Sequence, residues 1–381
     1  MVGRRMKIIL VANTGWYVAN FRLGLVRRLV AGGHDVIAVA PMDPADDRLS
    51  VAGARIVDLR LSRNGINPVS EVATVLQLRR IFTAENAEVV LSYTPKGTIY
   101  SAIALAGRRE RLIVNISGLG RAFAPGSRLR RLSTTLYRYA LGRASHVFFE
   151  NDHDRNMFVS AGIVRADRSD RIPGLGVDLA HFAPGVVPAA QRGAEGTRFL
   201  LCGRLLWDKG LAEYAESARA ARAAEPSTVF QILGFVEPPS VAAVPRATLE
   251  AWVAEGIVEY LGTTQDVRGA MLAADCIVLP SYYPEGVPRS LLEAAALGRP
   301  IITTDSTGCR DAVDDSQTGY LVQPRDADAL TAKLLAFTRL PPAVREAMGR
   351  AARAKMVAQF DENDVLDRID AVIASAVRVP R

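Results

Sequence analysis

Short apolar runs rich in β-branched residues alternate with longer stretches of helical periodicity in the first half of the chain. Successive positions in these runs are apolar, so both faces of each predicted strand would be buried, as in a parallel sheet covered by helices. The apolar periodicity predicts helices at 20–32, 70–85, 98–106 and 128–143. The strands are predicted at 7–12, 35–41, 54–59, 88–93, 111–116 and 146–151.

The same alternation resumes after a break at 183–196, where APGVVPAAQRGAEG has the Pro, Gly and small residues of a linker. Further strands are predicted at 198–204, 228–234, 258–262, 275–281, 300–305 and 319–324. A single amphipathic helix is predicted over about 360–377. The sequence therefore predicts an α/β protein with two successive doubly wound parallel-sheet domains, in which ligands bind beyond the carboxyl ends of the strands.

Composition and charge exclude several classes of protein. The chain has 381 residues, 49% hydrophobic and 23% charged, which excludes a disordered chain, a coiled coil and a small disulfide scaffold. Residues 1–190 hold 26 Lys and Arg against 15 Asp and Glu, whereas residues 191–381 hold 21 against 25. The net charge of +7 is therefore concentrated in the first half. We expect the two halves to have different partners.

Neither targeting nor metal-binding patterns stand out. The apolar runs are far shorter than the roughly 18 residues that span a bilayer, and the basic leader Met1–Lys7 is followed by no signal-peptide cleavage site. A cytoplasmic location is expected. The three cysteines and four histidines lack ligand spacing, so buried free thiols are predicted rather than a zinc or redox motif.

The first candidate site follows the strand RFLLC. Arg204 and Lys209 come after this strand and before a helix that is predicted to begin near Leu211. Two cations beside a helix N-terminus favour an anion site, because the helix dipole and the free N–H groups add to their charge. A diphosphate leaving group needs such neutralisation as its bond breaks. A solvated turn with two surface charges is the alternative.

The second candidate site follows the strand DCIVLPS. Glu285 and Glu293 lie eight residues apart, one before and one inside a helix predicted from Ser290 to Gly298. Carboxylates accept paired hydrogen bonds from vicinal hydroxyls, which suits a sugar or a ribose. A helix start at which the dipole favours acidic residues is the alternative interpretation.

These two elements, in this order and followed by PIITTDSTGCRDAV, resemble the retaining nucleotide-sugar glycosyltransferases of family four. The segments NTGWYVANFRLGL, SYTPKGTIY, NISGLGRAF and EGVPRSLLEAAALG are similar to a subgroup that extends undecaprenyl-diphosphate-linked sugars. The resemblance implies the GT-B fold, with two facing Rossmann-like domains. It places an acceptor domain at 1–182, a linker at 183–197, a donor domain at 198–358 and a helix returning to the first domain at 359–381.

The resemblance also implies roles for individual residues. Arg204 and Lys209 would hold the donor diphosphate and, with Glu285, form the catalytic group. Glu285 would contact the donor sugar and Glu293 the ribose. Gly15 would let the donor diphosphate approach the loop after the first strand closely. The backbone amides expected to help Glu285 are those of Gly286, Val287, Pro288 and Arg289.

Two departures from the family pattern concern the first domain. Many members carry a histidine that touches the donor sugar, where this chain has Ser117-Gly118. Only Gly15 stands where paired glycines are common. The triplet Asp152-His153-Asp154 could be interpreted as a metal site, but Asp152 suits a helix N-cap better. No metal and no other cofactor is expected.

A basic stretch in the first domain indicates where the acceptor lies. Nine arginines and one acid fall between Gly107 and Arg143, and the helix in it pairs an apolar stripe with cations. This pattern favours an anionic membrane surface, with a core-packed helix as the alternative. Lys96, Arg22, Arg130 and Ser117 are candidate acceptor ligands. No nucleic-acid partner is expected, because a recognition motif and an aromatic platform are missing.

Taken together, the sequence predicts a retaining, metal-independent glycosyltransferase that is peripheral to the inner face of the cell membrane. It would move an N-acetylhexosamine or hexose from a UDP-sugar to a diphospho-undecaprenol-linked glycan. A GDP-mannose donor, a soluble acceptor, a sugar-nucleotide epimerase and a nucleotide-binding regulatory module remain alternatives. Attack on the same face of the sugar as the departing diphosphate is the expected mechanism, because no residue stands out as a nucleophile.

Overall fold

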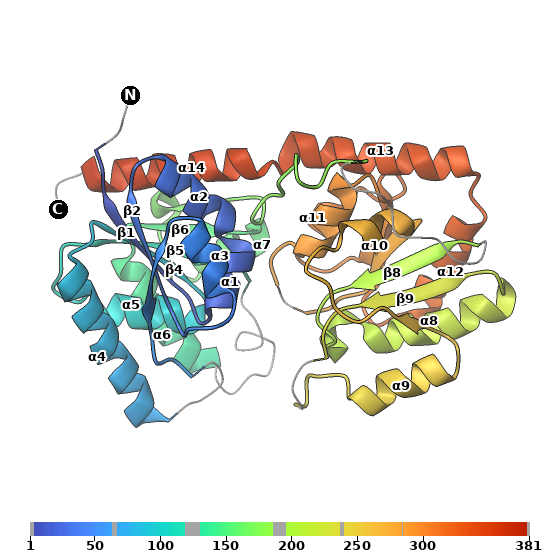
Figure 1. The fold of residues 1–381 in the computed structure, drawn as a ribbon, viewed down its shortest axis with the longest axis horizontal. Helices are drawn as coiled ribbons and strands as arrows, with labels where there is room; N and C mark the ends of the chain where they lie inside the picture. Colours follow the sequence, from blue (N-terminus) through green and yellow to red (C-terminus); the bar gives the residue numbers. More distant parts are fainter. Residues whose placement is uncertain are drawn as a thin grey trace. The chain divides into compact units, whose positions relative to one another are not determined.

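The chain folds into two compact units, each built around one parallel sheet with helices on both faces (Figure 1). The computed structural model describes residues 4–62, 67–118, 130–185, 196–236, 240–283 and 285–378. The first unit comprises residues 1–175 and 363–381, and the second comprises residues 176–362. The predicted fold class of two doubly wound parallel-sheet domains is confirmed.

The sheet of the first unit has seven parallel strands in the order β3-β2-β1-β4-β5-β6-β7. Ile9 of the central strand β1 (Lys7–Val11) pairs with Ile37 on one side and Val90 on the other. Ile9 and Ile8 point into different cores, because successive strand residues face opposite sides of a sheet. The other strands are β2 (Asp35–Ala40), β3 (Arg55–Asp58), β4 (Val89–Tyr93), β5 (Arg111–Ile116), β6 (His146–Phe149) and β7 (Ser169–Arg171).

Helices cover both faces of this sheet (Figure 1). One face is covered by α4 (Pro68–Glu85), α5 (Pro95–Ala104), α6 (Arg130–Arg143) and α7 (Asp152–Ser160). The other is covered by α1 (Gly15–Phe21), α2 (Leu23–Ala31), α3 (Asp46–Val51) and α14 (Glu362–Arg378). The C-terminal helix α14 thus packs on the first unit, as expected. Ile369 and Ile373 are buried there, and Arg28 Nε donates to Asp370 Oδ2 at 2.7 Å.

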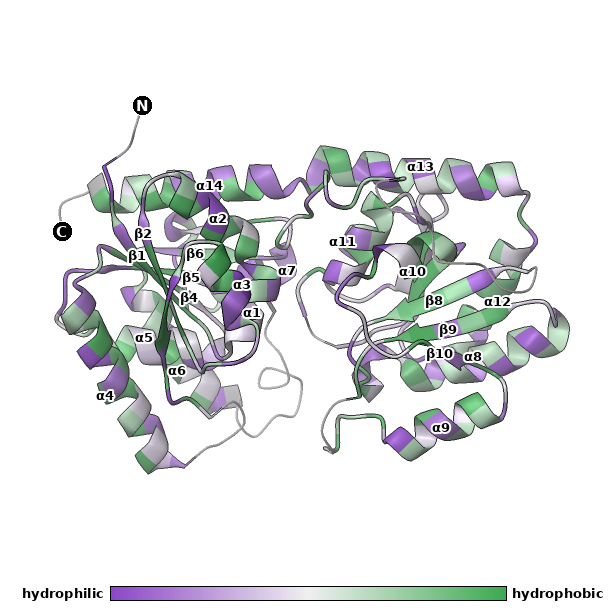
Figure 2. Cartoon of the chain, in the orientation of Figure 1, coloured by the Kyte–Doolittle hydropathy of each residue, from purple (hydrophilic) through white to green (hydrophobic). Residues whose placement is uncertain are grey.

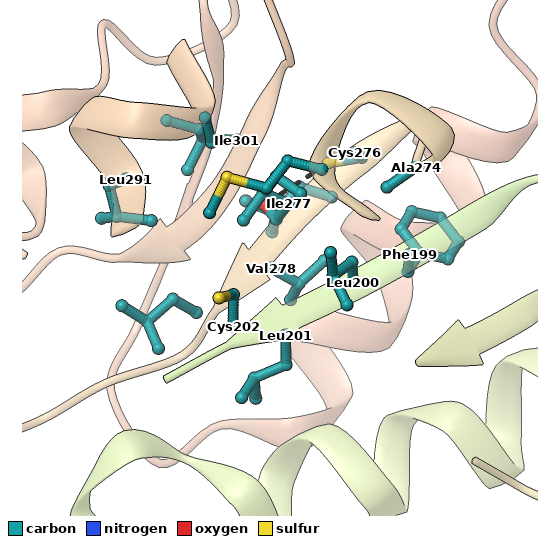
Figure 3. Close-up of a cluster of buried hydrophobic side chains, with 14 of the residues drawn as sticks. Phe199, Leu200, Leu201, Cys202, Ala274, Cys276, Ile277, Val278, Leu291 and Ile301 are labelled. Atoms are coloured by element: carbon teal, nitrogen blue, oxygen red, sulfur yellow. Dashed lines mark hydrogen bonds between the residues drawn. The ribbon is translucent and has the colours of Figure 1, made fainter. Parts of the chain in front are cut away.

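The sheet of the second unit has six parallel strands in the order β10-β9-β8-β11-β12-β13. Its core is formed by apolar side chains from β8, β11, β12 and α11, among them Phe199, Ile277 and Leu291 (Figure 3). The strands are β8 (Arg198–Cys202), β9 (Val229–Leu233), β10 (Glu259–Tyr260), β11 (Cys276–Leu279), β12 (Ile301–Thr304) and β13 (Gly319–Val322). The helices are α8 (Leu211–Ala224), α9 (Arg246–Ala254), α10 (Arg268–Ala273), α11 (Arg289–Ala296), α12 (Ala327–Thr338) and α13 (Pro342–Gln359).

Two local features differ from the pattern-based expectation. The edge strand β7 has the polar sequence Ser-Asp-Arg, which carries no apolar signal, and forms because it pairs with β6. The first unit ends at Leu175, ahead of the expected bound at 182. Val177 and Phe182 are buried in the core of the second unit, and Val177 N donates to Phe360 O at 2.8 Å.

Hydropathy follows this layered arrangement. The central strands carry hydrophobic residues, and the helices carry mixed faces (Figure 2). The three cysteines, Cys202, Cys276 and Cys309, are buried and unpaired, as predicted. Among the residues that the structure describes, every helix is too short or too polar to cross a membrane.

Candidate active site

The tight turn after β8 carries the two predicted phosphate-binding cations. Trp207–Lys209 form one turn of 3-10 helix, and Gly210 follows with a left-handed φ of 79° just before α8. A Cβ at Gly210 would overlap the carbonyl oxygen of Pro280 at the end of β11, so only glycine fits. This close approach brings the β8 turn against the segment that carries Glu285. Arg204 is half-buried at the same edge.

Lys209 and Glu285 form a nearly buried ion pair, in which Lys209 Nζ contacts Glu285 Oε1. Their side chains are 9% and 19% exposed. Ser281 Oγ lies 3.3 Å from the same carboxylate oxygen, and the ring of Tyr283 lies 5.9 Å from the ammonium. A charge pair with so little water around it is costly to break. The structure therefore brings together two residues that are 76 positions apart in sequence.

The segment after β12 contacts the backbone of the loop that carries Glu285. Thr304 Oγ1 and Ser306 Oγ both donate to the carbonyl oxygen of Ser281, the latter at 3.0 Å. Gly308 has a φ of 84°, and a Cβ there would overlap the backbone oxygen of Gly286. These supporting residues fix the position of the Glu285 backbone. They lie in the PIITTDSTG segment, whose small and hydroxyl residues are the only sequence signal for this role.

The remaining predicted donor ligands surround the N-terminus of α11. Gly286, Val287 and Pro288 are buried, and Pro288 stands at the N-cap position. Since proline has no N–H, Pro288 cannot donate, and the expected set of backbone donors is corrected to Gly286, Val287 and Arg289. The first N–H groups of a helix have no acceptor within the helix, so that of Arg289 is suited to a ligand oxygen.

Glu293 is buried in the second turn of α11, where Arg289 Nε donates to Glu293 Oε1 at 2.6 Å. Burial raises the pKa of the Glu293 carboxyl above its usual value, and the charge of Arg289 opposes this shift. Burial also raises the pKa of the neighbouring Cys202 thiol to about 12, with a further contribution from the charge of Glu293. Glu293 therefore lies near the end of β8, on the same edge as Arg204.

The raised pKa of Glu293 predicts how the second unit responds to pH. In the folded state the carboxyl keeps its proton to a higher pH than 4.5, so stability falls as pH rises from 4.5 through the folded pKa. Glu293→Gln has no carboxyl to titrate, so it should not lose stability in this way. The difference in unfolding free energy between Glu293→Gln and wild type should grow with pH in that window, by at most about 1.4 kcal/mol per unit. Urea unfolding at several pH values measures this difference. A difference in unfolding free energy that does not change with pH would contradict the raised pKa of Glu293.

In the first unit, Gly15 contacts carboxylates of its own unit. A Cβ at Gly15 would overlap Asp46 Oδ1, and Trp16 N donates to Asp43 Oδ2 at 2.5 Å. Burial raises the pKa of the Asp46 carboxyl. A side chain at position 15 would therefore force the Asp46 carboxylate to move.

The candidate acceptor ligands occupy different environments. Lys96 Nζ is paired with Glu71 Oε1 at 2.6 Å and donates to Ser62 O at 2.8 Å. Arg22 is only 3% exposed and pairs with Glu150, whereas Ser117 is half-buried just after β5. The side chain of Arg130 lies outside the described residues. The structure thus groups Arg22 with Ser117 and places Lys96 in a separate ion pair.

The Asp152-His153-Asp154 triplet opens α7. The N-cap is Asn151 and not the expected Asp152, because Asn151 Oδ1 accepts from Asp154 N at 2.7 Å. Asp154 is buried, and its Oδ2 accepts a hydrogen bond from Asn151 Nδ2 at 3.0 Å. The two aspartates therefore have different environments. Among the residues that the structure describes, no group of three or more His, Cys, Asp or Glu is arranged to hold a metal ion.

Comparison with known proteins identifies the family. Residues 196–339 match the family described as "Glycosyl transferases group 1", and residues 18–174 match the "Glycosyl transferase 4-like domain". The glycosyltransferase from Rickettsia africae has a similar structure, with a TM-score of 0.78 and 15% identity over 99% of this chain and 100% of that chain. Anabaena HepE, solved with UDP and glucose, has a TM-score of 0.76 and 18% identity over 97% of this chain and 100% of its own.

Two bacterial enzymes are similar in sequence. The Campylobacter jejuni N,N'-diacetylbacillosaminyl-diphospho-undecaprenol α-1,3-N-acetylgalactosaminyltransferase is 24% identical over 95% of this chain and 97% of its own. The Escherichia coli UDP-Gal:α-D-GlcNAc-diphosphoundecaprenol α-1,3-galactosyltransferase is 25% identical over 82% of this chain and 80% of its own. Together with the two parallel sheets and the matched domains, these similarities show that the chain belongs to the group 1 glycosyltransferases with the GT-B fold.

Proposed function

We propose that this glycosyltransferase moves a sugar, an N-acetylhexosamine or hexose, from a UDP-sugar to a glycan carried on diphospho-undecaprenol. The observation that carries this proposal is the nearly buried Lys209–Glu285 pair at the carboxyl edge of the second sheet. It joins a phosphate-binding cation to a sugar-binding carboxylate on the edge at which open α/β sheets bind ligands. The similar enzymes from Campylobacter jejuni and Escherichia coli, both named for diphospho-undecaprenol substrates, support the acceptor class.

In this proposal, Lys209 and Arg204 hold the donor diphosphate and neutralise the charge that develops on it. Glu285 accepts hydrogen bonds from the donor sugar, with help from the N–H groups of Gly286, Val287 and Arg289. Glu293 accepts from the ribose hydroxyls. Two cations supply the positive charge that the leaving diphosphate needs, so transfer needs no metal ion.

The transfer keeps the configuration of the anomeric carbon. The bond from that carbon to the diphosphate oxygen breaks, and a bond to the acceptor oxygen forms on the same face of the sugar. The acceptor proton passes to the departing diphosphate. The contact of Glu285 with Lys209 supports this route over double displacement, because a carboxylate paired with a cation is a weak nucleophile.

A binding panel followed by a transfer assay tests the function. We expect UDP to raise the thermal midpoint of the protein, and GDP to leave it unchanged. The transfer assay then uses UDP-GlcNAc, UDP-GalNAc, UDP-glucose and UDP-galactose, with N-acetylhexosamine-diphospho-undecaprenol as acceptor. Stabilisation by GDP alone would indicate a GDP-sugar donor. Interconversion of UDP-sugars without acceptor would indicate an epimerase. No response to any nucleotide would contradict the proposed enzyme.

We also propose that the protein is peripheral to the inner face of the cell membrane, where its acceptor lies. The exposed side of α6 supports this, because Arg131, Leu132, Arg138 and Tyr139 are all exposed on it and alternate cations with apolar groups. Such a face suits a helix that lies on an anionic lipid surface. Each arginine near such a surface contributes about 1 kcal/mol.

Charge reversal on α6 tests this attachment. We expect the double variant Arg131→Glu, Arg138→Glu to bind vesicles of phosphatidylglycerol and phosphatidylcholine at least about 30-fold more weakly, because two attractive contributions are lost. Vesicle sedimentation measures it. The control is Arg246→Glu, Arg350→Glu, the same charge change on exposed helices of the second unit. Equal sedimentation of both double variants would contradict the role of α6.

A further inference from the structure

A buried polar network lies at the carboxyl ends of β5 and β6 in the first unit, and it is absent from the donor machinery described above. Glu150 directly follows β6, and Asn115 and Ser117 come from the end of β5 and the residue after it. Tyr17 and Arg22 reach the network from α1 and from the junction of α1 with α2. Polar side chains at this edge of an open α/β sheet are placed where ligands bind.

Glu150 and Arg22 form the buried base of the network. Each is 3% exposed, and Arg22 Nη2 lies 3.5 Å from Glu150 Oε1. The guanidinium of Arg22 also lies 4.2 Å from the centre of the Tyr93 ring. Burial raises the pKa of the Glu150 carboxyl, and the charge of Arg22 opposes this shift. A guanidinium buried in this way has its charge balanced by Glu150, which makes it a poor ligand for an incoming diphosphate.

Side-chain N–H groups of the network point toward the hydroxyl groups of Tyr17 and Ser117. Asn115 Nδ2 donates to Glu150 Oε1 and to Ser117 Oγ, both at 3.0 Å. Arg22 Nη2 donates to Tyr17 Oη at 3.1 Å and lies 3.5 Å from Ser117 Oγ. Each hydroxyl oxygen thus accepts an N–H from this base, and Ser117 also hydrogen-bonds the Glu150 carboxyl. The oxygens of Tyr17 and Ser117 lie 3.3 Å apart.

Burial differs between the base and the hydroxyl groups. Arg22, Asn115 and Glu150 are at most 5% exposed, whereas Tyr17 and Ser117 are half-buried. Two buried atoms of the base, Arg22 Nε and Asn115 Oδ1, have no hydrogen-bond partner among the residues that the structure describes. Two half-buried hydroxyls that rest on a buried, ion-paired base at the carboxyl edge of the sheet point to a site built for a ligand.

We propose that Tyr17 and Ser117 form a hydroxyl pair that hydrogen-bonds an oxygen of a sugar substrate, and that Glu150 is the positioning residue for both. Glu150 acts through Asn115 and Arg22, whose donors it holds in place. The sugar oxygen belongs to the donor sugar or to the acceptor sugar, since both offer the same chemistry. This inference rests on the proposed glycosyltransferase function and adds Tyr17, Asn115 and Glu150 to it.

Steady-state kinetics on the full-length protein tests the pair. We expect Tyr17→Phe and Ser117→Ala each to raise the KM of one and the same substrate by about threefold to tenfold, the value of one hydrogen bond. An increase in the KM of the UDP-sugar assigns the donor sugar, and an increase in the KM of the lipid-linked acceptor assigns the acceptor. The affinity for UDP, measured by calorimetry, should not change. Ser117→Thr, which keeps a hydroxyl, should restore the wild-type KM.

Glu150→Gln tests the positioning role. It should raise the same KM, and the double variant Ser117→Ala, Glu150→Gln should show less than the sum of the two effects, because both changes act through one hydroxyl. If Glu150→Gln does not fold, Asn115→Ala takes its place and leaves the Arg22–Glu150 pair intact. Tyr320→Phe, which removes a hydroxyl from β13 and keeps the ring beside Lys333, is the control.

These measurements distinguish a failure of the hydroxyl site from a failure of the proposed glycosyltransferase function. Wild-type protein that transfers no sugar overturns the proposed function and the hydroxyl site with it. Normal wild-type transfer, with both KM values unchanged in Tyr17→Phe and Ser117→Ala, overturns the hydroxyl site alone. A lower thermal midpoint with unchanged KM in Glu150→Gln would show that Glu150 serves only the fold, and would overturn its positioning role.

Discussion

Lys209→Ala is expected to lower the rate of sugar transfer by on the order of 10² to 10³, because it removes a preorganised cation from the leaving diphosphate. The side chain is 9% exposed and pairs with Glu285, so water is a poor substitute for it. The loss should appear in kcat and in the affinity for UDP together. Steady-state kinetics and calorimetry with UDP measure these two quantities.

The chain offers a matched control for this variant. Lys355 is also a nearly buried lysine of the second unit, 8% exposed and paired with Asp314 Oδ1 at 2.6 Å. Lys355→Ala should cost a similar amount of stability and leave the transfer rate unchanged. Full activity of Lys209→Ala, or an equal loss in both variants, would contradict the assignment of Lys209 to the diphosphate.

Gly210→Ala is expected to have the largest effect on stability, about 2 to 4 kcal/mol, because two costs add. The left-handed φ of 79° strains any residue with a Cβ, and the Cβ would overlap the backbone oxygen of Pro280. Urea unfolding followed by the fluorescence of Trp207 and Trp252, both in the second unit, measures the loss. Movement of the β8 turn away from β11 should also weaken UDP binding.

Gly256→Ala separates the two costs. Gly256 has a φ of 76°, but a Cβ there has no atom within 4 Å. Its substitution should therefore cost only the backbone strain, about 1 kcal/mol. An equally small loss in Gly210→Ala would show that the close approach between the β8 turn and β11 does not constrain the site.

The apolar pattern was a sufficient guide to the central strands of both sheets. Their residues are buried on both faces, so hydrophobic runs such as 7–12 and 275–281 mark them directly. The edge strand β7 was missed because its Ser-Asp-Arg sequence is polar, and backbone pairing with β6 creates it. The N-cap of α7 was placed one residue late, because Asn151 and Asp152 are both good caps and only the local geometry distinguishes them.

Candidate site residues can be recognised in the sequence where charged side chains follow a predicted strand. Arg204, Lys209 and Glu285 lie in the segments that follow β8 and β11, and Glu293 lies in α11. The resemblance to known glycosyltransferases implies their roles. The supporting contacts were not predictable, because they join distant segments. Thr304 and Ser306 hold the backbone of Ser281, and Gly308 lies beneath Gly286. The role of Glu150 is likewise not predictable, since a single acid at the end of a strand carries no signal of what it pairs with.

The sequence by itself determined the two α/β domains, the excess of positive charge in the first half, and the residue types available at the strand ends. These depend on local periodicity and composition. Only the tertiary structure decided that Lys209 pairs with Glu285, that Arg22 is buried against Glu150, and that Lys96 is held by Glu71. The physical reason is that the energy and accessibility of a charged side chain depend on its partners and burial, which the packing of distant segments sets.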